Sequence, residues 1–207
     1  MDKKILKVCM LGSFSLEYAG KELVLDRNKN SKTTQLFQLL MLHTEDGGIS
    51  KAAMIEALYG RVEVENKNSS LNNTIFRLRK QLKDIGLPES KYINIQSGMC
   101  CWDENIKVWV DVCEFKRLVE QVRTEKREGD RLQLWLKIWK IYKGEFLPDM
   151  IGENWAAVEN VQCRDDYFQV TTQLCQWLKN NERYEDLHRI SHMTAEIYPF
   201  DEWQIWE

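Results

Sequence analysis

The sequence predicts an α+β fold in two parts: a small β-sheet with three helices, followed by an all-α region. Residues 1–25 are rich in β-forming side chains, and three amphipathic helical patterns follow them. A second β-rich stretch lies at 92–110, and beyond residue 111 only helical patterns remain. All the prolines fall between predicted helices, where their missing N–H is tolerated (Pro88, Pro148 and Pro199).

The first predicted element is a small antiparallel sheet. Its strands are expected at 7–11, 13–18 and 22–25, where β-branched, aromatic and leucine side chains predominate. Ala19-Gly20-Lys21 supplies the turn between the last two strands, because glycine adopts the left-handed conformation that tight turns need. This segment therefore predicts a three-stranded sheet before the helices begin.

Three helices are expected next. Ser31 is a plausible N-cap for the first, and Ser50 for a second helix over 51–59 that stops at Gly60. The third helix is expected from Ser69 to Ile85. Its apolar residues recur at spacings of 4, 3, 4 and 3, which places them on one buried face (Leu71, Ile75, Leu78, Leu82 and Ile85).

A hairpin follows the third helix. Strands are expected at 92–96 and 99–102 around the Ser97-Gly98 turn, with a further strand at 106–110. The order of sheet, three helices and hairpin is typical of a winged helix. We therefore expect a winged-helix domain over residues 1–111.

The second half is expected to be entirely helical, as a domain over 112–207. Helices are predicted at 113–127, 130–143, 153–180, 183–197 and from 200 onward. Short antiparallel helices with short loops favour a tetratricopeptide-like stack, although no internal repeat is visible. Trp135, Trp139 and Tyr142 follow helical spacing and are interpreted as a helix–helix core, with an aromatic ligand cage as the less favoured alternative.

The overall charge of −3 conceals two halves of opposite sign. Residues 1–100 carry 15 Lys and Arg against 11 Asp and Glu, whereas residues 101–207 carry 14 against 21, so the halves are expected to meet different partners. The six cysteines form no C-x-x-C pair and are interpreted as free thiols in a reducing cytoplasm. No transmembrane run and no secretory signal is recognisable, so a cytoplasmic location is predicted.

The third helix carries the functional prediction. From 66 to 83 there are five basic residues and no acidic one. Arginine can donate two hydrogen bonds to guanine, asparagine can pair with adenine, and Ser, Lys and a helix N-terminus suit phosphates. The sequence therefore predicts double-stranded DNA as partner, with this helix in the major groove. The candidate contacts are Ser69, Asn72, Asn73, Thr74, Arg77, Arg79 and Lys80, with Lys32, Thr33, Lys51 and Lys67 as further phosphate candidates.

Two alternatives to DNA binding stand beside this prediction. A basic helix can be a solvated surface, and the acidic second half would suit a protein-interaction module that does not bind DNA directly. Enzymatic activity is not expected, because there is no phosphate-binding glycine loop, no G-x-S-x-G and no Cys–His pairing. His188 and His192 share a helix face, but they are interpreted as plain surface; no metal or cofactor is predicted.

The order of several motifs resembles the Streptomyces antibiotic regulatory protein family. In the first half these are Leu11-Gly12-Ser13-Phe14, residues 51–60, residues 77–82 and the Ser97-Gly98 hairpin. The second half is similar to the family's bacterial transcriptional activation domain in residues 110–115, residues 142–148, Trp155 with Glu159, and residues 198–202. The resemblance covers nearly the whole chain, and the order and spacing of the motifs are more specific than any one of them.

The resemblance implies a bacterial transcription regulator of the activator type, whose first domain is similar to the response-regulator-type winged helix. The third helix would enter the major groove, the wing would touch the adjacent backbone or minor groove, and two protomers would sit side by side on repeated sites. The helical domain would contact RNA polymerase or another protein. This wing departs from the family pattern, because it offers Asn94, Gln96 and Met99 in place of an arginine and an aromatic residue.

Two further features differ from the family. Phe76 stands where many members carry a small polar residue; it could touch a thymine methyl group or pack against the sheet. The chain also stops inside a predicted helix that carries Trp203 and Trp206, so a fragment of a longer protein is expected, with these side chains covering an apolar surface.

Overall fold

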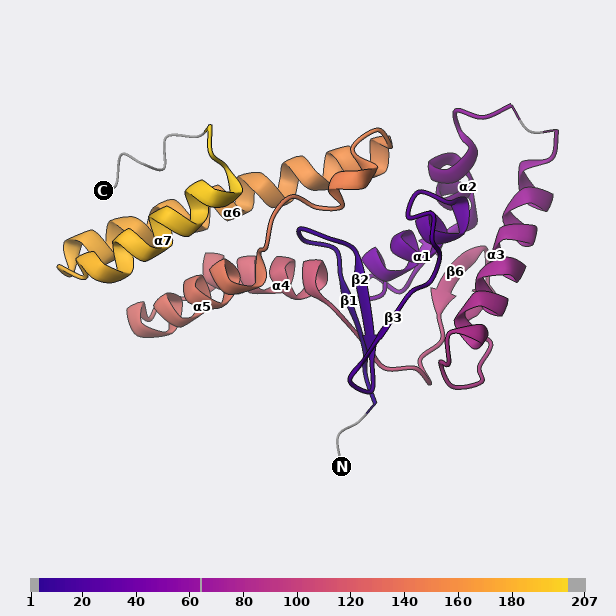
Figure 1. Ribbon diagram of the computed structural model, residues 1–207, viewed down its shortest axis with the longest axis horizontal. Helices are drawn as coiled ribbons and strands as arrows, with labels where there is room; N and C mark the ends of the chain where they lie inside the picture. Colours follow the sequence, from indigo (N-terminus) through magenta and orange to yellow (C-terminus); the bar gives the residue numbers. More distant parts are fainter. Residues whose placement is uncertain (1–3, 64, 201–207) are drawn as a thin grey trace.

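The computed structural model describes residues 4–63 and 65–200 (Figure 1). A four-stranded sheet with the order β3-β2-β1-β7 lies at the centre of the molecule. Its strands are β1 (Leu6–Cys9), β2 (Ser15–Tyr18), β3 (Lys21–Leu23) and β7 (Val108–Val110). The first three strands pair antiparallel, as predicted, and β7 joins β1 in parallel. A strand from the far end of the first half therefore completes the N-terminal sheet.

Three helices follow in the predicted order and pack against one another: α1 (Lys32–Leu42), α2 (Lys51–Tyr59) and α3 (Lys67–Asp84). The two predicted caps are confirmed, because Ser31 accepts a hydrogen bond from the Thr34 N–H and Ser50 accepts one from the Ala53 N–H. The start of α3 lies two residues before the predicted one. Asn66 caps it by accepting a hydrogen bond from the Ser69 N–H, so Ser69 lies inside the helix.

A hairpin of β5 (Ile93–Gln96) and β6 (Met99–Trp102) forms the predicted wing. Ser97 and Gly98 have φ angles of +50° and +80°, the left-handed pair that a two-residue turn between twisted strands requires. The short strand β4 (Ile49–Ser50) pairs with β6, and the Lys51 N–H donates to the Gly98 carbonyl. The hairpin is thereby attached to the beginning of α2.

The second half is helical throughout its described part. It contains α4 (Asp111–Thr124), α5 (Glu128–Ile141), the short 3₁₀ helix η1 (Pro148–Met150), α6 (Asn154–Asn180) and α7 (Tyr184–Ile197). The first two helices begin two residues earlier than predicted and end earlier, whereas α6 and α7 lie within one residue of prediction. The predicted helix from 200 onward, with Trp203 and Trp206, lies outside the described residues. None of the described helices is long and apolar enough to cross a membrane.

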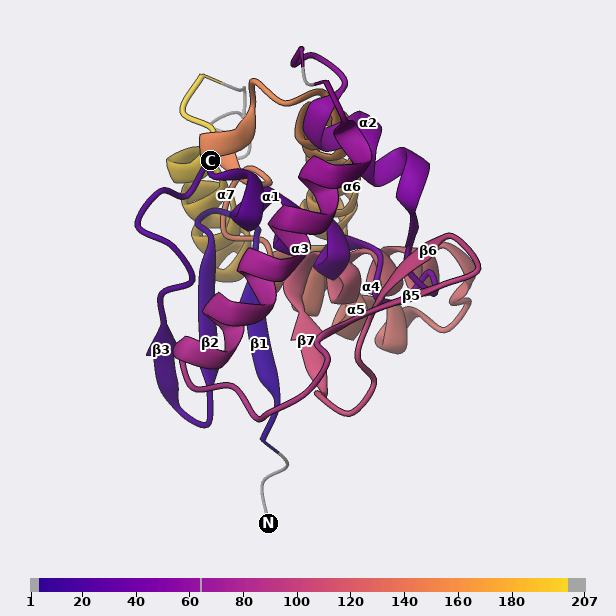
Figure 2. The ribbon, with the colours of Figure 1, turned by 90° about the vertical axis from the view of Figure 1, so that its right-hand side faces the viewer.

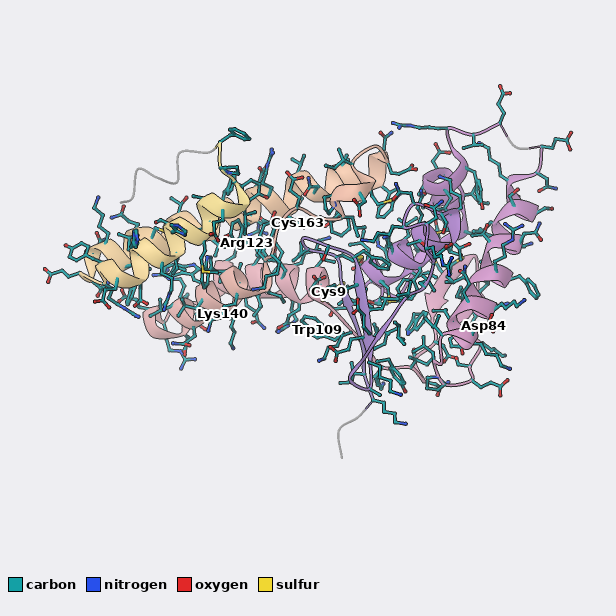
Figure 3. All side chains as sticks on the ribbon, viewed as in Figure 1. Cys9, Asp84, Trp109, Arg123, Lys140 and Cys163 are labelled. Atoms are coloured by element: carbon teal, nitrogen blue, oxygen red, sulfur yellow. The ribbon has the colours of Figure 1, made fainter. Side chains whose placement is uncertain are left out.

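Aromatic side chains hold the helical half together. Trp135 and Tyr142 are buried, which confirms the predicted helix–helix core. The Tyr142 ring stacks on Tyr167 with centroids 4.0 Å apart, and its hydroxyl lies 2.5 Å from that of Tyr198. Arg123, labelled in Figure 3, joins α4 to α6 through an ion pair with Asp166 at 2.8 Å. These contacts tie α4, α5, α6 and the end of α7 into one packed unit.

The two halves share backbone hydrogen bonds at their junction. The loop after α5 pairs with the end of β1: the Gly12 N–H donates to the Glu145 carbonyl, and the Leu147 N–H donates to the Met10 carbonyl, both at 2.9 Å. The carboxylate of Asp111, at the start of α4, accepts hydrogen bonds from the N–H groups of Met10 and Leu11 at 2.8–3.0 Å. The second half is therefore attached to the first by an isolated β-bridge between Leu11 and Phe146 and by Asp111, and not by a loose linker.

The described cysteines are all free thiols, as predicted. Cys100 is fully buried on β6, while its neighbour Cys101 is partly exposed on the other face, because successive side chains of a strand point in opposite directions. Burial raises the pKa of the Cys113 thiol to about 12, so this thiol stays protonated and unreactive at neutral pH.

Candidate nucleic-acid interface

The exposed face of α3 is the main feature of the candidate interface. Its core-facing residues Leu71, Ile75, Leu78 and Leu82 are at most 3% exposed and form the predicted stripe. A second stripe with the same spacing of 4, 3 and 4 runs along the opposite side and is exposed throughout (Ser69, Asn73, Phe76 and Lys80). Asn72 and Arg77 flank it and are also exposed. We call these six residues the α3 outer face.

Figure 2 looks onto this side of the molecule. There α3 lies in front of the strands, with the β5–β6 hairpin beside it and the helical half behind. In Figure 3, Asp84 marks the C-terminal end of α3, on the side of the molecule away from the helical half. A long rod-shaped partner could therefore lie along the α3 outer face without meeting helices α5 and α7.

All the charged side chains of α3 before Asp84 are positive. Glu65 lies just before α3 and Asp84 is its last residue. Between these two residues the chain carries no acidic side chain. The Lys83 ammonium donates to Glu89 at 2.8 Å, and this hydrogen bond raises the pKa of Lys83 above its usual range. The α3 outer face thus presents amide and cationic donors without a competing anion, which suits phosphates and the acceptor-rich edges of bases.

Arg79 does not lie on the α3 outer face. Its Nε donates to the carbonyl of Lys91 at 3.1 Å, and one terminal nitrogen donates to the carbonyl of Ile93 at 2.6 Å. The side chain therefore fastens the first strand of the wing to the middle of α3. The sequence predicted Arg79 as a direct DNA contact. In the structure its guanidinium instead donates to two backbone carbonyls of the same protein.

The root of the wing is held by a second set of hydrogen bonds. Asp103, only 5% exposed, accepts from the Ser90 hydroxyl and from the backbone and side-chain nitrogens of Asn105. These hydrogen bonds hold the pKa of Asp103 below its usual range, and the one from Ser90 has the largest effect. Within the wing, Gln96 is exposed, whereas Asn94 and Met99 are half-buried.

Two of the predicted contacts are buried. Thr74 is 6% exposed, and its hydroxyl lies 2.7 Å from that of Tyr59 on α2. Thr33, in the first turn of α1, is 7% exposed. Both threonines stand on the inner sides of their helices, so the structure separates them from the α3 outer face.

The remaining lysine candidates lie apart from one another. Lys51 and Lys67 are half-exposed at the starts of α2 and α3, where unpaired N–H groups also favour an anion. Lys32, at the start of α1, lies 3.4 Å from the carboxylate of Glu153 and 3.0 Å from the amide oxygen of Gln35. Its positive charge is therefore partly used in joining the two halves.

Sequence reasoning missed a contact between the loop after α2 and the start of α6. Arg61 donates to the Gly152 carbonyl at 3.1 Å and to the Asn154 side chain, 93 residues along the chain. Nothing in the local pattern around Arg61 signals these partners, because they come from the helical half. Among the described residues, no group of three or more His, Cys, Asp or Glu side chains could hold a metal ion.

Comparison with known proteins places the fold. In sequence, the chain matches no protein-family model and no curated protein. In structure, it is similar to Mycobacterium tuberculosis EmbR in complex with a low-affinity phosphopeptide, with a TM-score of 0.68 and 14% sequence identity. The similarity covers 97% of this chain and 52% of the EmbR chain, so this chain spans about half the length of EmbR. At this identity the likeness shows a shared fold alone, and the expected order of small sheets, three helices and further helices fits that fold.

Proposed function

We propose that this protein is a sequence-specific DNA-binding transcription regulator. Residues 1–111 would form a winged-helix DNA-binding domain of the response-regulator type, and residues 112–207 a tetratricopeptide-like domain for contact with other proteins. The observation that carries the proposal is the α3 outer face, an exposed surface of amide, hydroxyl and cationic side chains around Phe76, with no acidic residue over 66–83. The resemblance to the Streptomyces antibiotic regulatory protein family and the fold shared with EmbR support it.

The predicted contacts take different roles in this proposal. Asn72, Asn73 and Arg77 would read base edges, because their side chains are exposed at the middle of α3 and can make two hydrogen bonds to one base. Ser69 and Lys80 would contact phosphates on either side of the groove. Lys51 and Lys67 would hold the backbone from two helix starts.

Four other candidates would act less directly. Thr33 and Thr74 would set the packing of their helices, because both are buried. Arg79 would position the wing through the carbonyls of Lys91 and Ile93. Lys32 would reach a phosphate only by giving up its ion pair with Glu153. The candidate interface thereby contracts to the α3 outer face, two helix starts and the wing.

The helical half is proposed to bind a protein. Residues 101–207 carry 14 Lys and Arg against 21 Asp and Glu, so this half has a net negative charge. On α6, the side chains of Val158 and Val161 lie three residues apart and are 73% and 50% exposed. Exposed apolar side chains beside polar ones are typical of protein contacts. RNA polymerase or a second protomer would be such a partner. The same observation favours the second candidate function, a protein-interaction module that does not bind DNA directly.

Selection from random duplex DNA tests the proposal. The 207-residue chain would be immobilised and offered a pool of random duplexes at about 50 mM and about 200 mM salt, and the retained DNA sequenced. Regulator function predicts an enriched repeated motif and a steep loss of binding at the higher salt, since phosphate contacts release counterions. Arg77→Ala combined with Lys80→Ala should abolish enrichment, whereas Lys137→Ala, an exposed cation on α5, should leave it intact. Retention of no DNA at low salt would favour the protein-interaction module.

A further inference from the structure

Phe76 is the one apolar member of the α3 outer face. Its side chain is 69% exposed, so of the two alternatives that the sequence left open, packing against the sheet is wrong. The core-facing side of α3 is filled by leucines and Ile75, and Phe76 points away from them, in the same stripe as Asn73 and Lys80. A phenylalanine left in water gives up most of the free energy that its burial would provide, which makes its position informative.

The neighbours of Phe76 indicate what kind of partner covers it. Residues three and four positions away on a helix surround a side chain, and here Asn72, Asn73 and Lys80 are all exposed and polar. The surrounding charge is positive, with no carboxylate between 66 and 83. An apolar protein surface would have to desolvate these amides and cations to reach the ring. A polyanion with an apolar group set among hydrogen-bond acceptors offsets that cost, because its acceptors and charges replace the water around the amides and the lysine.

The major groove of DNA offers one such group. Base edges there present nitrogen and oxygen donors and acceptors, and the only apolar substituent is the 5-methyl group of thymine. We propose that Phe76 reads thymine through this methyl group, while Asn72, Asn73 and Arg77 read the polar edges beside it. The inference rests on the proposed DNA binding and deepens it, because it assigns a base identity to one side chain.

Removal of single methyl groups from the DNA tests the proposal. A duplex selected by the wild-type chain would be remade with each thymine replaced in turn by deoxyuridine, which deletes the methyl group and keeps every hydrogen bond. Dissociation constants would be measured by fluorescence anisotropy. At one thymine in each half-site the replacement should weaken binding by the wild-type chain about fourfold, the value expected for one buried methyl-sized group. In Phe76→Ala the same replacement should have no effect.

Control variants separate this role from others. Phe76→Leu keeps an apolar side chain and should keep part of the preference for thymine, whereas Lys80→Ala should weaken binding to both duplexes equally. Because Phe76 is mostly exposed, unfolding midpoints of the variants should stay close to wild type. Wild-type binding that is insensitive to every deoxyuridine, or an unchanged thymine preference in Phe76→Ala, would overturn this inference and leave DNA binding standing. Failure of the wild-type chain to bind any duplex would overturn both.

Discussion

Arg79→Ala is the substitution whose effect follows most directly from the geometry. The guanidinium makes two charge-assisted hydrogen bonds, at 3.1 Å to the Lys91 carbonyl and at 2.6 Å to the Ile93 carbonyl, and both carbonyls lie at the beginning of the wing. Hydrogen bonds from a charged group contribute about 1.5–3 kcal/mol each when buried. Arg79 is half-exposed, so we expect the pair to stabilise the wing against α3 by about 1–2 kcal/mol in total.

The loss should be local. Without Arg79, the hairpin should open about 5- to 30-fold more often, since about 1–2 kcal/mol corresponds to that change in an opening equilibrium. Hydrogen exchange followed by mass spectrometry would report this as faster exchange in a peptide covering 90–102, with unchanged exchange in α5 and α6. Arg79→Lys should restore less than half of the protection, because one ammonium cannot reproduce the fork of the guanidinium.

Lys80→Ala is the control for this experiment. Lys80 is the next residue along α3 but lies on the α3 outer face, so its removal should weaken DNA binding without changing exchange in the wing. Arg79→Ala should weaken DNA binding and speed exchange together. Unchanged exchange over 90–102 in Arg79→Ala would refute the assignment of Arg79 to the wing and return it to the direct contacts.

Three further predictions concern the interface, the junction and pH. Arg77→Ala should reduce discrimination between specific and random duplex by about 1–3 kcal/mol, whereas Lys51→Ala should weaken binding to both evenly; equal losses for Arg77→Ala in competition assays would contradict this division. Gly12 has a φ of +94°, and a Cβ there would lie 3.1 Å from the Lys143 carbonyl oxygen, so Gly12→Ala should lower the free energy of unfolding by about 1–3 kcal/mol. Gly129→Ala, in open space at the start of α5, should be neutral or stabilising in the same urea titration; equal effects would remove the argument from close approach. Burial raises the pKa of the Asp111 carboxyl to about 6, above the ordinary 3.8. The stability that its protonated form provides is therefore complete below about pH 4 and is lost as the pH rises through 6, by about 3 kcal/mol. Unfolding free energies of wild type and Asp111→Asn, measured from about pH 4 to about pH 7, should differ by a quantity that falls over this window, and a constant difference would show that Asp111 does not titrate there.

Local chemistry made much of the fold predictable. Ser31 and Ser50 cap their helices as expected because an N-cap depends only on a side chain and the next three N–H groups. The Ser97-Gly98 turn follows from backbone sterics in the same way. The start of α3 was predicted two residues late, since Asn66 and Ser69 are both good caps and local rules do not rank them in this context. The parallel pairing of β7 with β1 joins residues about 100 apart, and no local pattern encodes it.

The candidate site was predictable only in part. Burial of the leucine stripe fixed which side of α3 faces outward, and this placed Asn73, Arg77 and Lys80 correctly in solvent. Thr74 is buried beside Tyr59, whose hydroxyl contacts that of Thr74 from another helix. Lys32 pairs with the carboxylate of Glu153, which is 121 residues away along the chain. A side chain at the edge of a helix face is decided by its tertiary neighbours, and these are absent from the sequence pattern.

The shared backbone pairing at the junction also determines where the chain can be cut. A fragment ending at residue 111 would leave the N–H of Gly12 and the carbonyl of Met10 without the partners that Glu145 and Leu147 supply. It would also bring into solvent the apolar side chain of Leu11, which is 2% exposed in the whole chain. Such a fragment should associate or precipitate more readily than the intact protein. Biophysical work on the first half of the chain should therefore keep the segment through Met150 in the expressed protein.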